Sequence, residues 1–220
     1  MGFSREIKVL DEDLEKILFF EGLRSRMLEL PEEDLKKQIQ KLSILRLSSS
    51  QSNITKDSAT LERWNKAQRC LFENSTSLID YEFIKKINEI LTGKNIVERT
   101  QDIYGGGAAF LSNTEKNKEL MHFQNEILPN LHKLHPIVAS TALRYWLVSL
   151  HPFVDGNGRT SQSVADARLF KASFPPLYFK NSYQGSFAYI SIHREDFNFR
   201  SALQISFIGL SNAFQVILSD

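Results

Sequence analysis

The sequence has little of what disulfide-rich, metal-cluster or membrane proteins need. Its 220 residues include a single cysteine, Cys70, which excludes an internal disulfide and a zinc site built on several thiolates. No run of apolar residues approaches the roughly 18 needed to cross a bilayer. The first residues, MGFSREIKVLDEDLEK, contain no apolar stretch of signal-peptide length. We therefore expect no membrane partner.

The chain also lacks an excess of charge of either sign. Lys and Arg number 27 and Asp and Glu number 26, which leaves a formal net charge of +1. Proteins that wrap nucleic acid along its phosphates carry a clear basic excess, so we predict no nucleic-acid partner. Hydrophobic residues make up 42% and charged residues 24%, as in an ordinary folded domain. At about 150 residues per domain, the length indicates one compact domain plus an extension.

The spacing of apolar residues predicts an all-α fold. Helical periodicity covers residues 11–47, with a break at Pro31, and then 60–72, 80–91, 117–134, 136–150 and 193–218. The polar stretch LSSSQSNITKDSA, residues 47–59, predicts a linker. We therefore interpret residues 1–59 as an N-terminal helical extension with a Ser-rich linker and residues 60–220 as the main domain.

A glycine triplet interrupts the helical pattern before residue 117. Residues 105–107 are all glycine, and they follow Ile103 and Tyr104 within IVERTQDIYGGGAAFLSNTEK. Glycine disfavours a helix and adopts positive φ at little cost. The segment predicts a short β-hairpin or an irregular flap, with a plain loop as the alternative.

One segment, LHPFVDGNGRTSQSVADARLF at residues 150–170, combines groups suited to phosphate chemistry. It is typical of a helix end, a tight turn and a new helix that begins near Asn157. Gly156 and Gly158 allow backbone N–H groups to converge at that helix start. Together with the helix dipole and the guanidinium of Arg159, these amides form an anion-binding site. We predict that the ligand is a phosphate chain.

An acid and a histidine next to this anion site add chemistry to it. The Asp155 carboxylate would repel an anion unless a divalent cation stood between them, and Mg²⁺ held by one carboxylate and substrate phosphates is the usual arrangement. His151 is placed to remove a proton from an attacking hydroxyl near neutral pH. Each residue alone also fits an ordinary loop or turn. Their combination indicates transfer of a phosphate-containing group to an alcohol.

The same segment resembles the signature of the Fic family, His-x-Phe-x-(Asp/Glu)-Gly-Asn-Gly-Arg-x-x-Arg. Seven of its eight specified positions match, namely His151, Phe153, Asp155, Gly156, Asn157, Gly158 and Arg159. The resemblance extends to the helix before the motif, to the glycine-rich segment and to the helix after that segment, over residues 60–215. It implies a Fic-type helical bundle with a small β-hairpin flap.

Members of this family mostly transfer AMP from ATP to a Ser, Thr or Tyr hydroxyl of a target protein. The resemblance gives each motif residue a role: His151 is the general base, Asp155 the Mg²⁺ ligand, Asn157 with the amides of Gly156 and Gly158 the α-phosphate site, and Arg159 the β-phosphate ligand. It thus implies Mg²⁺ as cofactor and ATP as co-substrate.

The resemblance also implies how a target protein binds. The flap around Ile103 and Tyr104 would hold a target segment as an added strand and align its hydroxyl with His151. The expected partner is a protein that carries a hydroxyl side chain, a class that includes this protein itself, and a homodimer stays open. The expected location is a bacterial-type cytoplasm, and export as an effector is an alternative.

Two departures from the family pattern affect the same charge pair. The last position of the signature is Gln162 instead of the arginine that contacts the γ-phosphate, and a neutral amide cannot form the charged bidentate fork. The inhibitory pattern (Ser/Thr)-x-x-x-Glu-(Gly/Asn) resembles residues 48–53, with Ser48 first and Asn53 last, but Ser52 replaces its glutamate. A chance match of a Ser-rich linker is the alternative. We hypothesise that the protein lacks the family's glutamate switch.

Three functions therefore remain on the sequence alone. The first is protein AMPylation from MgATP. The second is transfer of another phosphate-containing group from a different nucleotide, because Gln162 weakens the expected contact with ATP. The third is a catalytically weak or inactive Fic-fold binding module.

Overall fold

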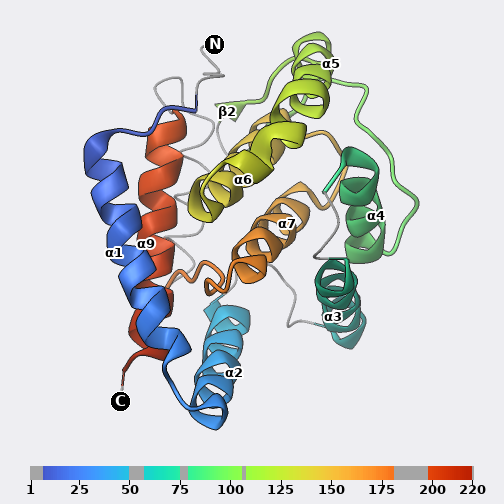
Figure 1. Cartoon of the computed structure of the whole chain (residues 1–220). Coiled ribbons are helices and arrows are strands. Elements are labelled where there is room, and N and C mark those ends of the chain that lie inside the picture. The colour runs from blue at the N-terminus through green and yellow to red at the C-terminus, as the bar shows by residue number, and fades with distance from the viewer. Residues whose placement is uncertain (1–6, 50–56, 75–78, 106–107, 181–197, 220) are drawn as a thin grey trace.

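The computed structural model describes residues 7–49, 57–74, 79–105, 108–180 and 198–219. Most of these residues are helical, which confirms the predicted all-α fold class. Figure 1 shows the α-helices, which are α1 (Asp11–Leu28), α2 (Glu32–Ser49), α3 (Ser58–Glu73), α4 (Tyr81–Thr92), α5 (Asn113–His122), α6 (Pro136–Leu150), α7 (Asn157–Lys171) and α9 (Phe199–Ile217). Within these ranges no helix is both long and apolar enough to span a bilayer.

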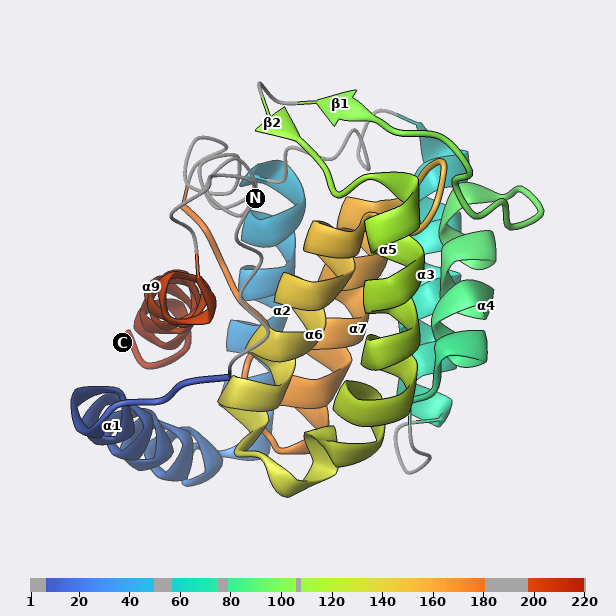
Figure 2. The ribbon, with the colours of Figure 1, turned by 90° about the horizontal axis from the view of Figure 1, so that it is seen from above.

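Helices α6 and α7 form the centre of the bundle. In Figure 2 they lie side by side, with α3 and α4 on one flank and α1, α2 and α9 on the other. The sequence predicts one apolar stripe on residues 136–150, yet 13 of the 15 residues of α6 are buried. A helix that is covered on all sides buries its polar positions too. Thr141 and Ser140 meet this condition by donating hydrogen bonds to Ile137 O and Ala165 O.

The N-terminal helices pack onto this central pair and onto α9. The Phe20 ring of α1 stacks on Phe207 and Phe214 of α9, with ring centroids 5.5 and 6.1 Å apart. Arg46 near the end of α2 forms an ion pair with the buried Asp166 of α7. Burial raises the pKa of the Asp166 carboxyl, and the positive charge of Arg46 opposes that rise. The end of α2 is thereby tied to the helix that carries the signature.

The segment predicted as one helix over 117–134 is built from three shorter pieces. Helix α5 ends at His122, a π-helical turn covers Phe123–Ile127, and a 3-10 helix covers Leu128–Lys133. Pro129 has no backbone N–H and cannot continue the α-helical hydrogen bonding. The changed pitch still directs Phe123, Leu128 and Leu131 into the core. At the C-terminus, described structure resumes at residue 198, and Asn198 caps α9.

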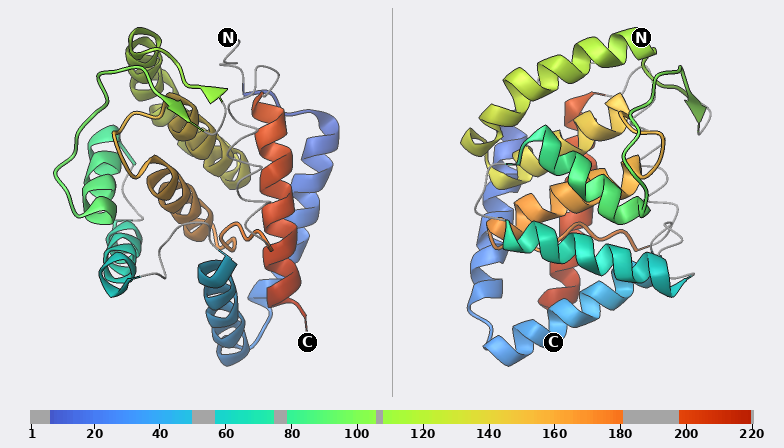
Figure 3. Two further views of the ribbon diagram at one scale, coloured as in Figure 1. Left: turned by 180° about the vertical axis from the view of Figure 1, so that it is seen from behind. Right: turned by 90° about the vertical axis from the view of Figure 1, so that its right-hand side faces the viewer.

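The glycine-rich segment contains a short antiparallel ribbon at one end of the bundle. Strands β1 (Tyr104–Gly105) and β2 (Ala108–Ala109) pair in the register Tyr104 with Ala109 and Gly105 with Ala108. The Phe110 N–H donates to Ile103 O at 3.3 Å, so the hydrogen bonding continues one residue past the strands. Figure 3 shows that the ribbon projects beyond the helices. The backbone of Tyr104 is placed, but its side chain lies outside the described part of the chain.

Candidate active site between α6 and α7

His151 lies where α6 ends, in a constrained backbone conformation. It has φ 45° and ψ 58°, the left-handed region, and its N–H donates to Leu147 O at 3.2 Å. A residue with a Cβ adopts this conformation at a cost, so the surrounding contacts must hold it there. The imidazole packs against the Phe110 ring, with centroids 4.2 Å apart. The predicted base is therefore in direct contact with the segment that follows β2.

The turn after His151 is closed by Asn157. The Asn157 Oδ1 accepts from Phe153 N at 2.9 Å, and its Nδ2 donates to Phe153 O at 2.7 Å. Phe153 is 1% exposed and stacks on Tyr81 of α4, so it anchors the loop in the core. The side-chain amide of Asn157 is thus used to shape the loop, which sequence reasoning did not anticipate. The backbone N–H of Asn157 is the first of α7 and remains suited to an anion.

The two glycines of the loop differ in what surrounds them. Gly156 has φ 79°, and a Cβ placed on it would lie 2.7 Å from Thr92 Cγ2 and 2.8 Å from Asn88 Nδ2. Gly158 is exposed, and a Cβ placed on it would have nothing within 4 Å. Gly156 is therefore required by the packing against α4. Gly158 adjoins open space at the start of α7, where the first helical hydrogen bond is Thr160 N to Gly156 O.

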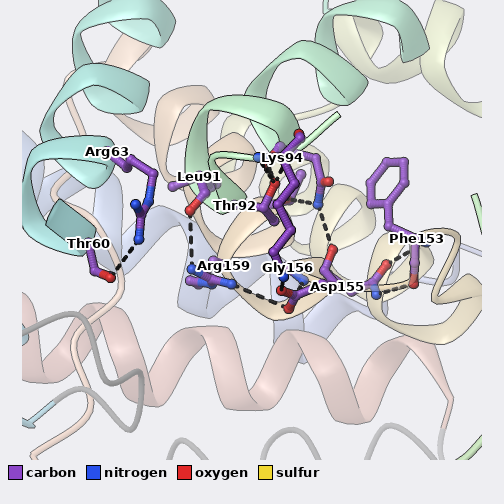
Figure 4. A network of polar contacts seen from close by, with 12 residues as sticks. Thr60, Arg63, Leu91, Thr92, Lys94, Phe153, Asp155, Gly156 and Arg159 are labelled. Atoms are coloured by element: carbon purple, nitrogen blue, oxygen red, sulfur yellow. Dashed lines mark hydrogen bonds and ion pairs between the residues drawn. The ribbon is translucent and has the colours of Figure 1, made fainter. Parts of the chain in front are cut away.

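Helix α4 fixes this loop from its other side. The buried Asn88 donates from Nδ2 to Asp155 O at 2.9 Å and to Thr160 Oγ1 at 3.0 Å. Arg159 donates from Nη1 to Leu91 O at 3.1 Å, as Figure 4 shows. Sequence reasoning missed Asn88, because a single asparagine on a helix carries no signal that it contacts a loop 67 residues away. Through these two hydrogen bonds Asn88 holds the loop at Asp155 and the first turn of α7 at Thr160.

Asp155 is the acidic group of the site, and it faces solvent. Its side chain is 52% exposed. Its Oδ1 accepts from Gly156 N at 2.6 Å and lies 3.4 Å from Arg159 Nη2, and its Oδ2 lies 3.6 Å from Lys94 Nζ. Exposed ion pairs of this length contribute little to stability, so a ligand can replace them at low cost. The carboxylate is thus accessible and is flanked by cations.

This set of ligands suits a metal ion that arrives with phosphates. Among the described residues, no three His, Cys, Asp or Glu side chains are grouped to hold a metal ion by themselves. Mg²⁺ commonly binds through one or two carboxylates plus substrate phosphates. One exposed carboxylate beside the amides of a helix start and an arginine matches that arrangement.

A second arginine, Arg63 of α3, reaches the same end of α4. Its Nη2 donates to Thr60 Oγ1 at 2.9 Å, and its Cδ would lie 2.9 Å from a Cβ on Gly93. Figure 4 shows Arg63 and Arg159 at the C-terminal turn of α4. Sequence reasoning did not select Arg63, because α3 lies outside the signature.

The structure places the residues of the predicted inhibitory pair only in part. Gln162 is half-buried on α7, one helical turn beyond Gly158. Ser48 is in the last turn of α2, and its side chain is not described. Ser52 and Asn53 lie outside the described residues. Asp166, which pairs with Arg46 of α2, is one turn from Gln162 on α7.

These features define a helical-bundle protein whose loop and helix start form a phosphate-binding site beside a histidine. A sequence model of the Fic/DOC family matches residues 78–169, which include the flap, α6 and most of α7. Residues 78–169 thus match a Fic/DOC domain, which confirms the resemblance seen in the signature.

Comparisons with known proteins agree with this assignment. A curated relative, the protein adenylyltransferase Fic of Drosophila virilis, is 48% identical over 44 residues, which are 20% of this chain and 9% of the relative. The match thus spans less than a tenth of that relative's length. The solved structure of a Fic domain-containing signaling protein from Bacteroides thetaiotaomicron superposes with a TM-score of 0.68 at 15% identity, covering 92% of this chain and 96% of the other.

A further solved structure is that of IbpAFic2 in complex with adenylylated Cdc42. It superposes with a TM-score of 0.67 at 17% identity and covers 94% of this chain and 71% of the other. At such identities the two superpositions establish the fold of the chain.

Proposed function

We propose that this protein is a protein adenylyltransferase that transfers AMP from MgATP to a Ser, Thr or Tyr hydroxyl of a target protein. The observation that carries the proposal is the open space at Gly158, at the start of α7. Arg159 and Asp155 lie beside it, and the loop that leads to it begins at His151. The adenylyltransferase name of the curated relatives supports the same activity.

The proposed reaction is an in-line displacement at the α-phosphorus of ATP. The target hydroxyl oxygen forms a bond to that phosphorus, and the bond to the bridging oxygen of the β-phosphate breaks. Pyrophosphate leaves with the bonding electrons, and His151 accepts the hydroxyl proton on an imidazole nitrogen. The amides at the start of α7 stabilise the charge on the α-phosphate oxygens, as preorganised donors do in other acyl and phosphoryl transfers.

The remaining groups bind the nucleotide and its cation. The Asp155 carboxylate would hold Mg²⁺, which neutralises phosphate charge when bound. Arg159 is held against α4 by Leu91 O and keeps its other amino group toward Asp155, where it would meet the β-phosphate. Gln162 offers neutral hydrogen bonds where the family has a second arginine, so we expect a weak contact with the γ-phosphate.

A protein target is the proposed second substrate. A structural neighbour was solved with adenylylated Cdc42, so the fold accommodates a protein whose side chain has received AMP. The ribbon β1–β2 lies beside His151 through Phe110, and an extended target segment can add to such a strand edge. This arrangement would bring a hydroxyl toward the imidazole.

A direct test uses the purified protein with Mg²⁺ and each of ATP, CTP, GTP and UTP labelled at the α-phosphate. We expect label from ATP to appear on protein and to resist denaturation, because the bond is covalent. In His151→Ala the transfer rate should fall by roughly 100-fold or more, the size of a lost general base. Binding of MgATP by calorimetry should persist in that variant. Equal labelling by both proteins would contradict the proposed role of His151.

A second candidate function follows from Gln162. If another nucleotide labels the protein better than ATP does, the enzyme uses a different donor. If none binds, the chain is a Fic-fold binding module that contacts a partner through its flap or N-terminal helices. Absence of the glutamate switch predicts that Ser52→Gly in the full-length protein does not raise the rate of transfer from any donor, with the wild type as the reference.

A further inference from the structure

We propose that Arg99 is a positioning residue that holds the flap in register with His151. For its effect on catalysis this inference rests on the function proposed above. Its structural part, the position of the flap relative to the imidazole, stands on the contacts of Arg99 alone.

The guanidinium of Arg99 is buried, and each of its three nitrogens donates a hydrogen bond. Arg99 is 2% exposed, and its Nε donates to His151 O at 2.8 Å. Its Nη2 donates to Leu150 O at 3.1 Å and to Leu111 O at 2.7 Å, and its Nη1 donates to Gln101 O at 3.0 Å. Four of the five N–H groups of the side chain therefore have backbone acceptors.

These four carbonyls belong to two separate structures. Leu150 and His151 end α6, where carbonyl groups have no helical donor and the helix dipole is negative. Gln101 precedes β1, and Leu111 follows β2, so they are the two ends of the flap. The Arg99 guanidinium thus links both ends of the flap to Leu150 and to His151, the predicted base.

The backbone of Arg99 adds to the same junction. Its N–H donates to Pro152 O at 2.9 Å, and its carbonyl accepts from Lys116 Nζ at 2.8 Å. Lys116 is on α5 and is also 2% exposed. Two neighbouring buried cations are costly, and burial lowers the pKa of both side chains. The bonds that these two side chains make all converge on the backbone of this loop and of the end of α6, which points to positioning of the loop.

Phe110 connects the position of the flap to the position of the His151 ring. Phe110 directly precedes Leu111 and packs on the imidazole at a centroid distance of 4.2 Å. When Arg99 holds Leu111 O and His151 O together, the ring and the imidazole have one relative position. A target strand added to the flap then presents its hydroxyl at one distance from the base. Misplacement by about 1 Å can lower a rate roughly 100-fold.

The test compares Arg99→Lys with Arg24→Lys in the full-length protein. Lysine keeps the charge but offers a point donor that cannot bridge both sides. Arg24 is a matched control, because it is a half-buried arginine that donates to the Ala172 carbonyl far from the flap. The first measurement is the ¹H–¹³C spectrum of histidine-labelled protein without nucleotide, with the His151 signal assigned from His151→Ala. The second is hydrogen exchange of the Phe110 amide.

In Arg99→Lys we expect the His151 ring signal to lose its ring-current shift from Phe110 and the Phe110 amide to exchange at least tenfold faster. Arg24→Lys should change neither. With α-labelled MgATP, Arg99→Lys should label protein at least tenfold more slowly while its Kd for MgATP changes less than twofold. A fall in stability alone would not produce this split.

Unchanged His151 and Phe110 signals in a folded Arg99→Lys would overturn the proposal. If Arg99→Lys does not fold, the wild type decides. The Arg99 Nε–H, which donates to His151 O, should exchange with solvent at least tenfold more slowly than the Nε–H of the half-buried Arg24, and equal exchange overturns the proposal. If the wild type labels no protein but the spectra change as expected, the proposed function fails and the positioning role stands.

Discussion

Two alanine substitutions, Gly156→Ala and Gly158→Ala, should have opposite effects although each adds one methyl group to the same loop. At Gly156 the backbone has φ 79°, and an added Cβ would lie 2.7 Å from Thr92 Cγ2 and 2.8 Å from Asn88 Nδ2. The left-handed conformation costs a non-glycine residue about 1 to 2 kcal/mol, and overpacking costs about 1 to 3 kcal/mol. We expect Gly156→Ala to lower the free energy of unfolding by about 2 to 5 kcal/mol.

At Gly158 the added Cβ meets nothing within 4 Å, and φ is ordinary for a helix. Alanine is a better helix former than glycine by about 1 kcal/mol, so the free energy of unfolding should stay constant or rise by up to that amount. If a phosphate approaches the amide of Gly158, the methyl group obstructs it. A clash of about 1.4 kcal/mol or more would weaken MgATP binding tenfold or more.

The assays are urea denaturation followed by helical circular dichroism, and calorimetric titration with MgATP. Each variant serves as the control of the other, because the chemical change is identical. A loss of stability under about 1 kcal/mol in Gly156→Ala would refute the packing argument. Wild-type affinity for MgATP in Gly158→Ala would refute the phosphate site at the start of α7.

Three further predictions concern charge and loop support. Gln162→Arg should raise the affinity for MgATP by about 1.5 kcal/mol, or roughly tenfold, because a charged donor replaces a neutral one; unchanged binding by calorimetry would contradict this. Asn88→Ala should destabilise the protein by about 2 kcal/mol, since the buried Thr160 Oγ1 and the partly buried Asp155 O lose their donor, and a denaturation midpoint equal to that of the wild type would speak against it. Hydrogen bonds from Ser112 hold the pKa of Glu115 below its ordinary value of 4.5, so its stabilising effect is present above that value and is lost as pH falls through the lower folded pKa. Denaturation of wild type and Glu115→Gln should therefore differ less at low pH than at pH 7, and a constant difference would rule this out.

The signature carried most of the site because its residues are close in sequence. Residues 151–159 form one turn and one helix start, so their spacing alone brings His151, Asp155 and Arg159 together. Local backbone rules also indicated the helix break at the glycine-rich segment. Pro129 indicates a break in the helix after α5. The sequence does not indicate that a π-helical turn and a 3-10 helix follow, because that choice depends on which side chains pack into the core.

The supports of the site were not visible in the sequence. Asn88 and Arg99 act on residues 67 and 52 positions away, and neither has a local pattern that distinguishes it from a surface residue. The side chain of Asn157 looked available for a phosphate, yet it closes the turn on Phe153. These side chains bond backbone N–H and C=O groups that have no partner within a helix or strand, and only the packed structure shows which groups those are.

Residue types and their short spacing were enough to predict the helical class and the Fic-type signature, and they named the candidate residues for chemistry at residues 151–159. Tertiary structure alone decided that the flap lies against His151, that α4 fixes the loop and that Gly156 and Gly158 have different roles. The physical reason is that buried carbonyls at the end of α6 and along the loop must find donors, and the chain supplies them from distant helices and strands.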